Sequence, residues 1–308
     1  MHQLCVVTSA VSCPSPNESP QGVPTAVEIP GKTHTMITKS FSDAATWIRH
    51  FRDFDIPVMN ETVEIIASLH PDDDRINANL LAEIALKDPL MTLRILVHVS
   101  RKYASRLQTD VETVRAALIL LGIQPFMRDF SNLPSIGERI GNHHVAAAGL
   151  RAAIERAWRA SRFALGFAVH RMDDDADVIH QAALLHDFIG LLLWCEAPDL
   201  ATEIQHRQQN NPELRTTQAR LEVLHAEPEA IELSLMTAWR LPALLRQMAD
   251  PRFQHQSSVQ NVKLAVRIAR HTQHSWDNPA LPDDFTDLGH LLGISRTAAR
   301  DLARELDS

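Results

Sequence analysis

The stretch that decides the fold reads AALLHDFIGLLLWC and spans residues 182–195. Apart from His186 and Asp187, every residue in it is apolar or glycine. Buried strands of this kind end after about four to eight residues, whereas a longer apolar run is typical of a buried helix. The pattern therefore predicts one helix over residues 175–195, with a histidine and a carboxylate in its middle.

Helical periodicity continues on both sides of this stretch. Residues 146–172 predict one long helix or two in tandem. Asp88-Pro89 is a typical helix start, with a capping side chain followed by proline at the first helical position. Gly122 is placed to end the helix that we expect to open at Thr109-Asp110. Further helices are predicted near 42–51, 58–69, 76–86, 89–99, 198–209, 214–225, 228–238, 241–249, 258–275 and 285–306. No segment predicts a strand, so the fold class is all-α.

The first 40 residues have a different composition. They are rich in Pro, Ser and Thr and lack helical periodicity, which predicts a disordered tail. Met36 is an alternative start of the protein that the sequence alone does not decide. No apolar run approaches the roughly 20 residues that cross a bilayer. No Lys or Arg precedes the short apolar segment at the N-terminus, as it would in a signal peptide. We expect a cytoplasmic protein without a membrane partner.

Composition excludes several function classes. The formal net charge is −8, whereas nucleic-acid binders usually carry a basic surface. Only 10 glycines occur, and no phosphate-binding loop, dinucleotide fingerprint or GxSxG elbow is present. The three cysteines are too widely spaced for a disulfide framework or a zinc ribbon.

His186 and Asp187 are the strongest candidates for a site. A neutral imidazole beside a carboxylate suits a divalent metal such as Mg, Mn or Fe. The alternative is that both side chains hydrogen-bond to neighbouring helices, since buried polar groups need partners.

Several segments, in a fixed order, resemble one family. They are Phe54–Met59 (FDIPVM), Leu86–Thr92 (LKDPLMT), Ala116–Gly122 (AALILLG), Trp158 with Ser161, Ala183–Phe188 (ALLHDF) and Ala238–Pro242 (AWRLP). Together they resemble the HDOD domain, a helical bacterial output domain related to HD phosphohydrolases. The resemblance implies an HD-like helical bundle in two lobes and a role in bacterial signal transduction as an output or interaction module, often near cyclic-di-GMP and two-component pathways.

The resemblance also allows a test of the metal site. HD hydrolases add a first histidine on the preceding helix and a closing aspartate on a later one. Here Ala160 takes the place of that histidine, and residues 254–276 contain no Asp or Glu. His186 and Asp187 are then a vestigial metal pair, and we expect no cofactor and no catalytic residue. His180, His225 and His271 remain alternative ligands that would complete a site.

Two further features lie near the C-terminus. Lys263, Arg267, Arg270 and His274 share one face of the predicted helix 258–275 and form a candidate surface for an anion or an acidic partner; the alternative is a solvated face. Residues 285–306 resemble a helix-turn-helix with its turn at Gly293-Ile294-Ser295. Residues 281–308 hold three arginines against six acidic residues, so a closing helical hairpin is favoured over DNA binding.

These observations give one hypothesis with two alternatives. The HDOD domain spans 42–250, with an N-terminal helical lobe at 42–140 and an HD-like lobe at 145–250. Helices in 251–308 pack on the HD-like lobe. We expect a non-catalytic regulatory module that binds a partner protein, with a small nucleotide as a second candidate partner. The alternatives are a metal-dependent phosphohydrolase and a DNA-binding regulator.

Overall fold

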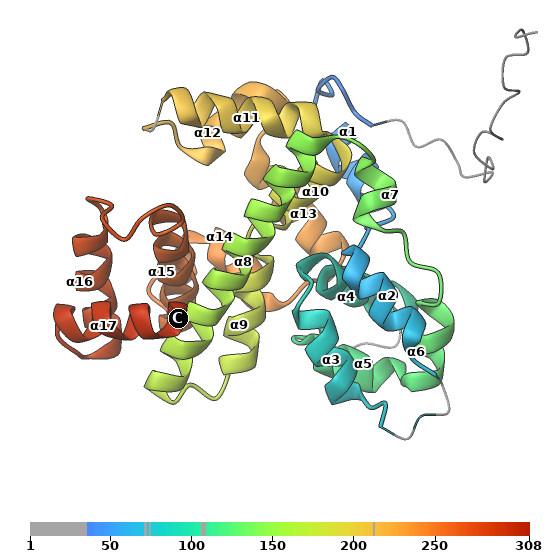
Figure 1. Cartoon of the computed structure of the whole chain (residues 1–308), viewed down its shortest axis with the longest axis horizontal. Coiled ribbons are helices and arrows are strands. Elements are labelled where there is room, and N and C mark those ends of the chain that lie inside the picture. Colours follow the sequence, from blue (N-terminus) through green and yellow to red (C-terminus); the bar gives the residue numbers. More distant parts are fainter. Residues whose placement is uncertain (1–35, 71–72, 74, 106–108, 212) are drawn as a thin grey trace, which may run out of the picture. The chain divides into compact units, whose positions relative to one another are not determined.

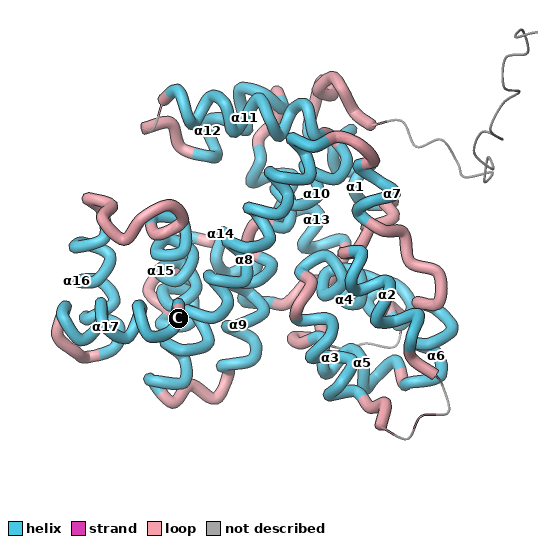
Figure 2. The backbone as a smooth tube through the Cα atoms, viewed as in Figure 1, coloured by secondary structure: helices cyan, strands magenta, loops and turns pink. Residues whose placement is uncertain are grey.

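Helices and loops make up the described part of the chain. The computed structural model describes residues 36–308 except 71, 72, 74, 106–108 and 212, so most of the predicted tail lies outside the described residues. Residues 36–308 form one compact unit. Within it the described chain contains no strand, only a single parallel bridge between Val58 and Ser135 (Figure 2). The all-α prediction is confirmed.

Side chains cap the starts of most of the N-terminal helices. Their bounds are α1 Ala44–Arg52, α2 Asn60–Ser68, α3 Ala78–Leu86, α4 Pro89–Tyr103, α5 Val114–Leu121, α6 Ile123–Asp129 and α7 Ile136–Ile140. The buried Asp88 carboxylate accepts hydrogen bonds from the backbone amides of Leu90 and Met91, as predicted. Gly122 ends α5 with a φ of +82°, a conformation that favours glycine.

Helix α5 starts later than the sequence indicates. Thr113, rather than Asp110, caps it by accepting a hydrogen bond from the amide of Ala116. The Asp110 carboxylate instead pairs with Arg240 at 2.8 Å and Arg246 at 2.6 Å. These long-range ion pairs join the loop before α5 to the segment that follows α13 (Pro228–Ala238).

Helix α1 departs from the predicted lobe boundary. It packs mainly against α13 (Figure 1). The Trp47 indole donates a hydrogen bond to the carbonyl of Leu224. Residues just before α1 make similar contacts, because the amide of Ile37 donates to the carbonyl of Glu196. The chain therefore contributes residues from before position 53 to the HD-like helices.

The HD-like helices surround one long central helix. Their bounds are α8 His144–Arg171, α9 Ala176–Leu185, α10 Phe188–Glu196, α11 Pro198–Asn210, α12 Thr216–Leu224, α13 Pro228–Ala238 and α14 Ala243–Ala249. Helix α8 is continuous over 28 residues, which decides between the one-helix and two-helix predictions. Its Phe163 and Phe167 are fully buried. Gly149 has no room for a Cβ, which would overlap the Trp194 ring of α10.

The apolar stretch 176–196 is long and apolar enough to cross a membrane, contrary to the expectation from the sequence. In its most apolar window 78% of the residues are buried inside the protein, as in the core helix of a soluble protein. The apolar composition of this stretch is therefore explained by its burial in the protein core.

Three α-helices close the chain. Their bounds are α15 Ser257–His271, α16 Leu281–Leu292 and α17 Arg296–Asp307, and the short 3-10 helix Pro251–Phe253 precedes them. The turn between α16 and α17 lies at Gly293, with a left-handed φ of +68°, as the sequence indicates. Helix α15 packs on α8 and α9, and α17 packs on α8 (Figure 1). Arg159 of α8 pairs with Asp307 at 2.7 Å.

Candidate functional site

His186 and Asp187 lie at a break between two helices. The sequence predicts one helix over 175–195, but α9 ends at Leu185 and α10 begins at Phe188. Asp187 has φ −108° and ψ 40°, outside the helical region. The prediction of one uninterrupted helix is therefore wrong. The local pattern does not reveal the break, because the residues on both sides of His186 and Asp187 are apolar.

The His186 side chain is half-buried, and its Nδ1 atom is buried without a hydrogen bond. No protein group among the described residues pairs with its Nδ1 atom. Burial lowers the pKa of His186, and the nearby Asp187 charge opposes this only in part. The side chain is therefore neutral at pH 7, with one ring nitrogen available to a small polar ligand or a water.

A small cavity of about 30 Å³ adjoins this imidazole. Ala160, which replaces the first histidine of the HD enzymes, lines it together with Arg156 and Val266. A cavity of this size accommodates about one water molecule. The space opposite His186 is thus bounded by a methyl group where the resemblance would place a second imidazole.

The Asp187 carboxylate is occupied by guanidinium groups. Arg220 Nη2 forms an ion pair with Asp187 Oδ1, and Arg156 Nη2 lies 3.8 Å from the other oxygen. Burial would raise the pKa of Asp187, but the charges of Arg220 and Arg156 outweigh that effect and lower it. Asp187 is therefore ionised and already neutralised by protein cations.

Arg220 also reaches a second acid. Its Nη1 atom lies 3.3 Å from Oε1 of Glu232, which is on α13. Burial raises the pKa of Glu232 to about 7, with Arg220 acting in the opposite direction. Gly190 lies against this group, because a Cβ at that position would overlap Asp187 and Arg220. Asp187, Arg220 and Glu232, which we call the arginine triad, follow no spacing that the sequence alone reveals.

The alternative histidine ligands lie apart from this pair. Within the described ranges no three His, Cys, Asp or Glu side chains are grouped so that they could hold a metal. His271 Nδ1 instead lies 2.5 Å from Asp284 Oδ2. His225 is exposed at the end of α12, and His180 lies half-buried on α9, where burial lowers its pKa.

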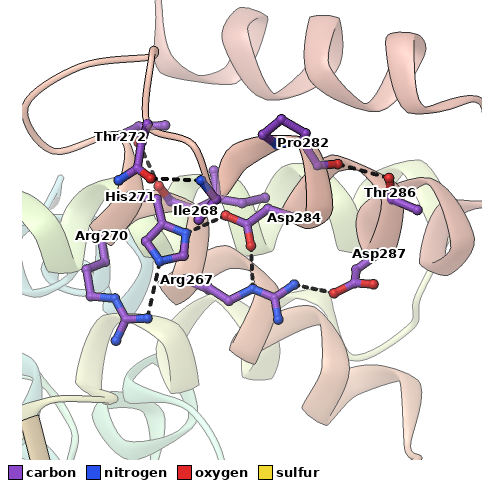
Figure 3. A network of polar contacts seen from close by, with 11 residues as sticks. Arg267, Ile268, Arg270, His271, Thr272, Pro282, Asp284, Thr286 and Asp287 are labelled. Atoms are coloured by element: carbon purple, nitrogen blue, oxygen red, sulfur yellow. Dashed lines mark hydrogen bonds and ion pairs between the residues drawn. The ribbon is translucent and has the colours of Figure 1, made fainter. Parts of the chain in front are cut away.

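The predicted basic stripe is partly used within the protein. Arg267 pairs with Asp284 at 2.6 Å and with Asp287 at 2.5 Å, as Figure 3 shows. Both carboxylates come from α16. They lie outside residues 254–276, and the sequence therefore does not identify these two as partners of Arg267. The prediction that the helix continues to residue 275 is wrong, since α15 ends at His271 and His274 lies beyond it. Lys263 and Arg270 lie near enough to lower the pKa of His186.

Comparison with known proteins identifies the family of this chain. The model of the HDOD domain matches residues 56–257. The chain belongs to the HDOD family. No curated protein matches its sequence.

Solved structures share the fold of this HDOD chain. The MmoQ response regulator from Methylococcus capsulatus has a TM-score of 0.62 at 16% identity, covering 81% of this chain and 98% of that one. A fragment of the same regulator gives 0.52 at 19% identity, covering 76% and 91%. A virulence factor from Campylobacter jejuni gives 0.55 at 16% identity, covering 86% and 93%. At identities this low, the structural similarity shows a common fold and nothing more.

Proposed function

We propose that this HDOD chain is a non-catalytic module of a bacterial signal-transduction pathway and acts by binding a partner protein. Its family and its response-regulator neighbour support a signalling role. The proposal that it does not catalyse a reaction rests on the residues around His186 and Asp187.

One observation carries the proposal, namely the ion pair between Arg220 and Asp187. A divalent metal bound to Asp187 would lie beside a fixed positive charge, and like charges at such a distance repel strongly inside a protein. Arg156 adds a second cation within 3.8 Å of the same carboxylate. Only His186 and Asp187 would donate to the metal here, so the residues do not fit a metal centre that activates water.

Elemental analysis tests this proposal. We expect Mn, Fe, Ni and Zn in the purified protein to stay well below one per chain, and to be unchanged by His186→Ala or Asp187→Asn. Hydrolysis of bis(p-nitrophenyl) phosphate with added Mn²⁺ should not exceed that of His186→Ala. One metal per chain that both variants lose, together with turnover, would establish the phosphohydrolase alternative instead.

A second arm addresses the DNA-binding alternative. We expect duplex DNA to bind no more tightly to the wild type than to an Arg296→Ala/Arg300→Ala variant. Salt-dependent binding that this variant loses would favour a DNA-binding regulator, because such binding depends on phosphate contacts by basic side chains.

A further inference from the structure

A second, larger cavity lies outside the HDOD match. It has a volume of about 430 Å³ and is formed by the loop after α15 and the first turns of α16 and α17. Small-molecule pockets span roughly 300–1,000 Å³. Residues of three kinds line it: apolar or aromatic Trp276, Pro279, Leu281, Pro282 and Phe285; polar Asn278 and Thr297; and charged Asp277, Arg296 and Arg300.

One part of the lining is aromatic. The rings of Trp276 and Phe285 are nearly parallel, with 15° between their planes and 6.3 Å between their centroids. Arg304 lies over the Trp276 ring, with its guanidinium carbon 5.6 Å from the centroid. Phe285 is buried and Trp276 is partly exposed, so Trp276 supplies the ring surface against which a planar ligand can pack.

The other part of the lining is basic. Arg296 and Arg300 are exposed and lie one turn apart on the same face of α17. Arg300 pairs with the neighbouring Asp301 at the surface, from Nε at 2.9 Å and from Nη2 at 2.8 Å, and both side chains remain exposed to solvent. The structure shows no hydrogen bond or ion pair of the Arg296 guanidinium with any described residue. The one acid in the lining, Asp277, already accepts a hydrogen bond from Ser275 at 3.1 Å.

We propose that this cavity binds a mononucleotide, with its base against Trp276 and its phosphate on Arg296 and Arg300. Paired guanidiniums match a phosphate by geometry and by charge. The remainder of residues 281–308 is acidic, which disfavours a long polyanion but leaves room for one phosphate. The proposal does not depend on the absence of catalysis at His186 and Asp187.

Calorimetric titration of the full chain tests this proposal. The probes are AMP, GMP, CMP and UMP, with adenosine and ribose 5-phosphate as partial ligands that lack either the phosphate or the base. We expect at least one mononucleotide to bind and both partial ligands to bind much more weakly. Arg296→Ala and Arg300→Ala should each weaken binding about tenfold, since a charge-assisted hydrogen bond is worth about 1.5 kcal/mol or more.

Matched variants show whether binding depends on this cavity. Arg151→Ala removes another exposed arginine, on α8, and should leave binding unchanged. Trp276→Leu should weaken mononucleotide binding but not alter the small affinity for ribose 5-phosphate. The proposal fails if no mononucleotide binds, if adenosine binds as tightly as AMP, or if the two arginine variants bind normally. Binding of single-stranded DNA without binding of any mononucleotide would also overturn it.

Discussion

At the scale of single residues, Arg220 sets the charge balance at the break between α9 and α10. It is a nearly buried cation between Asp187 and Glu232, with its side chain 10% exposed. Removing one member of a buried ion pair leaves the other charge without a partner, which costs more than the pair contributes in the first place. The stability of the α9–α10 junction should therefore depend on this side chain.

We expect Arg220→Met to lower the free energy of unfolding by about 2 kcal/mol. This is less than for a fully buried pair, because the Asp187 side chain is 35% exposed and solvent screens its charge. Denaturant titration at pH 7 measures the change. Arg207→Met, which breaks exposed pairs with Glu203 and Glu222, should cost much less, because solvent screens exposed ion pairs. Equal losses in the two variants would contradict the role of the arginine triad.

Glu232 should give the protein a specific pH dependence. Its pKa in the folded protein is raised from 4.5 to about 7 by burial. The folded state therefore binds this proton more tightly than the unfolded state, and the stability due to Glu232 falls as pH rises from about 4.5 to 7.

Glu232→Gln should remove that dependence. The variant should match the wild type at pH 4 and exceed its stability at pH 8 by about 3 kcal/mol, a figure set by the size of the shift. The measurement is the difference in unfolding free energy between the two proteins across this range. A constant difference at all pH values would show that Glu232 does not titrate as described.

At the scale of helices, a close approach between α8 and α10 helps to hold the HD-like part together. Gly149 allows α8 to contact the Trp194 ring, where a Cβ would overlap it. We expect Gly149→Ala to cost about 1–3 kcal/mol, the usual range for overpacking. Thermal unfolding measures this loss, and adding Trp194→Leu should restore part of it. If Gly149→Ala is neutral, the two helices do not approach this closely.

Asp284 fastens α16 to α15. Its carboxylate is 3% exposed and contacts both Arg267 and His271 (Figure 3). Asp284→Asn should cost about 2 kcal/mol through lost charge-assisted hydrogen bonds and increase amide hydrogen exchange across 281–307. Asp283→Asn changes the exposed neighbouring acid and should alter neither quantity. Exchange that rises equally in both variants would argue against this attachment.

The helix boundaries show which features can be predicted from the sequence. Local signals were sufficient where one segment determines its own structure, as at Asp88-Pro89 and Gly122. They were insufficient where a distant group decides the outcome. Asp110 is occupied by Arg240 and Arg246, so Thr113 caps α5 in its place.

The candidate site also contains residues that the sequence identifies and partners that it does not. The sequence picked out His186 and Asp187, and the resemblance pointed to Ala160, which the structure places in the same cavity. The partners of Asp187 and Arg267 come from other helices and follow no local spacing. Arg220 lies 33 residues from Asp187, and Asp284 lies beyond the end of the helix that carries Arg267.

At the scale of the whole molecule, Asp110 joins the two parts of the HDOD fold. Burial would raise its pKa, but Arg246 and Arg240 outweigh burial and lower it. Its stabilising effect is therefore present above the unfolded pKa of about 3.8 and is lost as pH falls below it.

We expect Asp110→Asn to increase amide hydrogen exchange in α3–α5 at pH 7, because α5 would lose the pairs that hold its preceding loop. At pH 2–3 the variant and the wild type should become alike. Hydrogen exchange followed by mass spectrometry measures both conditions, with Asp53→Asn, an exposed acid near α1, as the control. A difference that persists at acidic pH would mean that the charge of Asp110 is not the cause.

The ion pair between Arg220 and Asp187 has a consequence beyond stability. A metal ion can be withdrawn from a protein by a chelator or by starvation, and a metal-dependent fold then loses its ligand-bound state. A guanidinium attached to the chain cannot be withdrawn in this way. We therefore expect the melting temperature to be the same with and without EDTA, so that the protein would keep one conformation whatever the supply of metal in the cell.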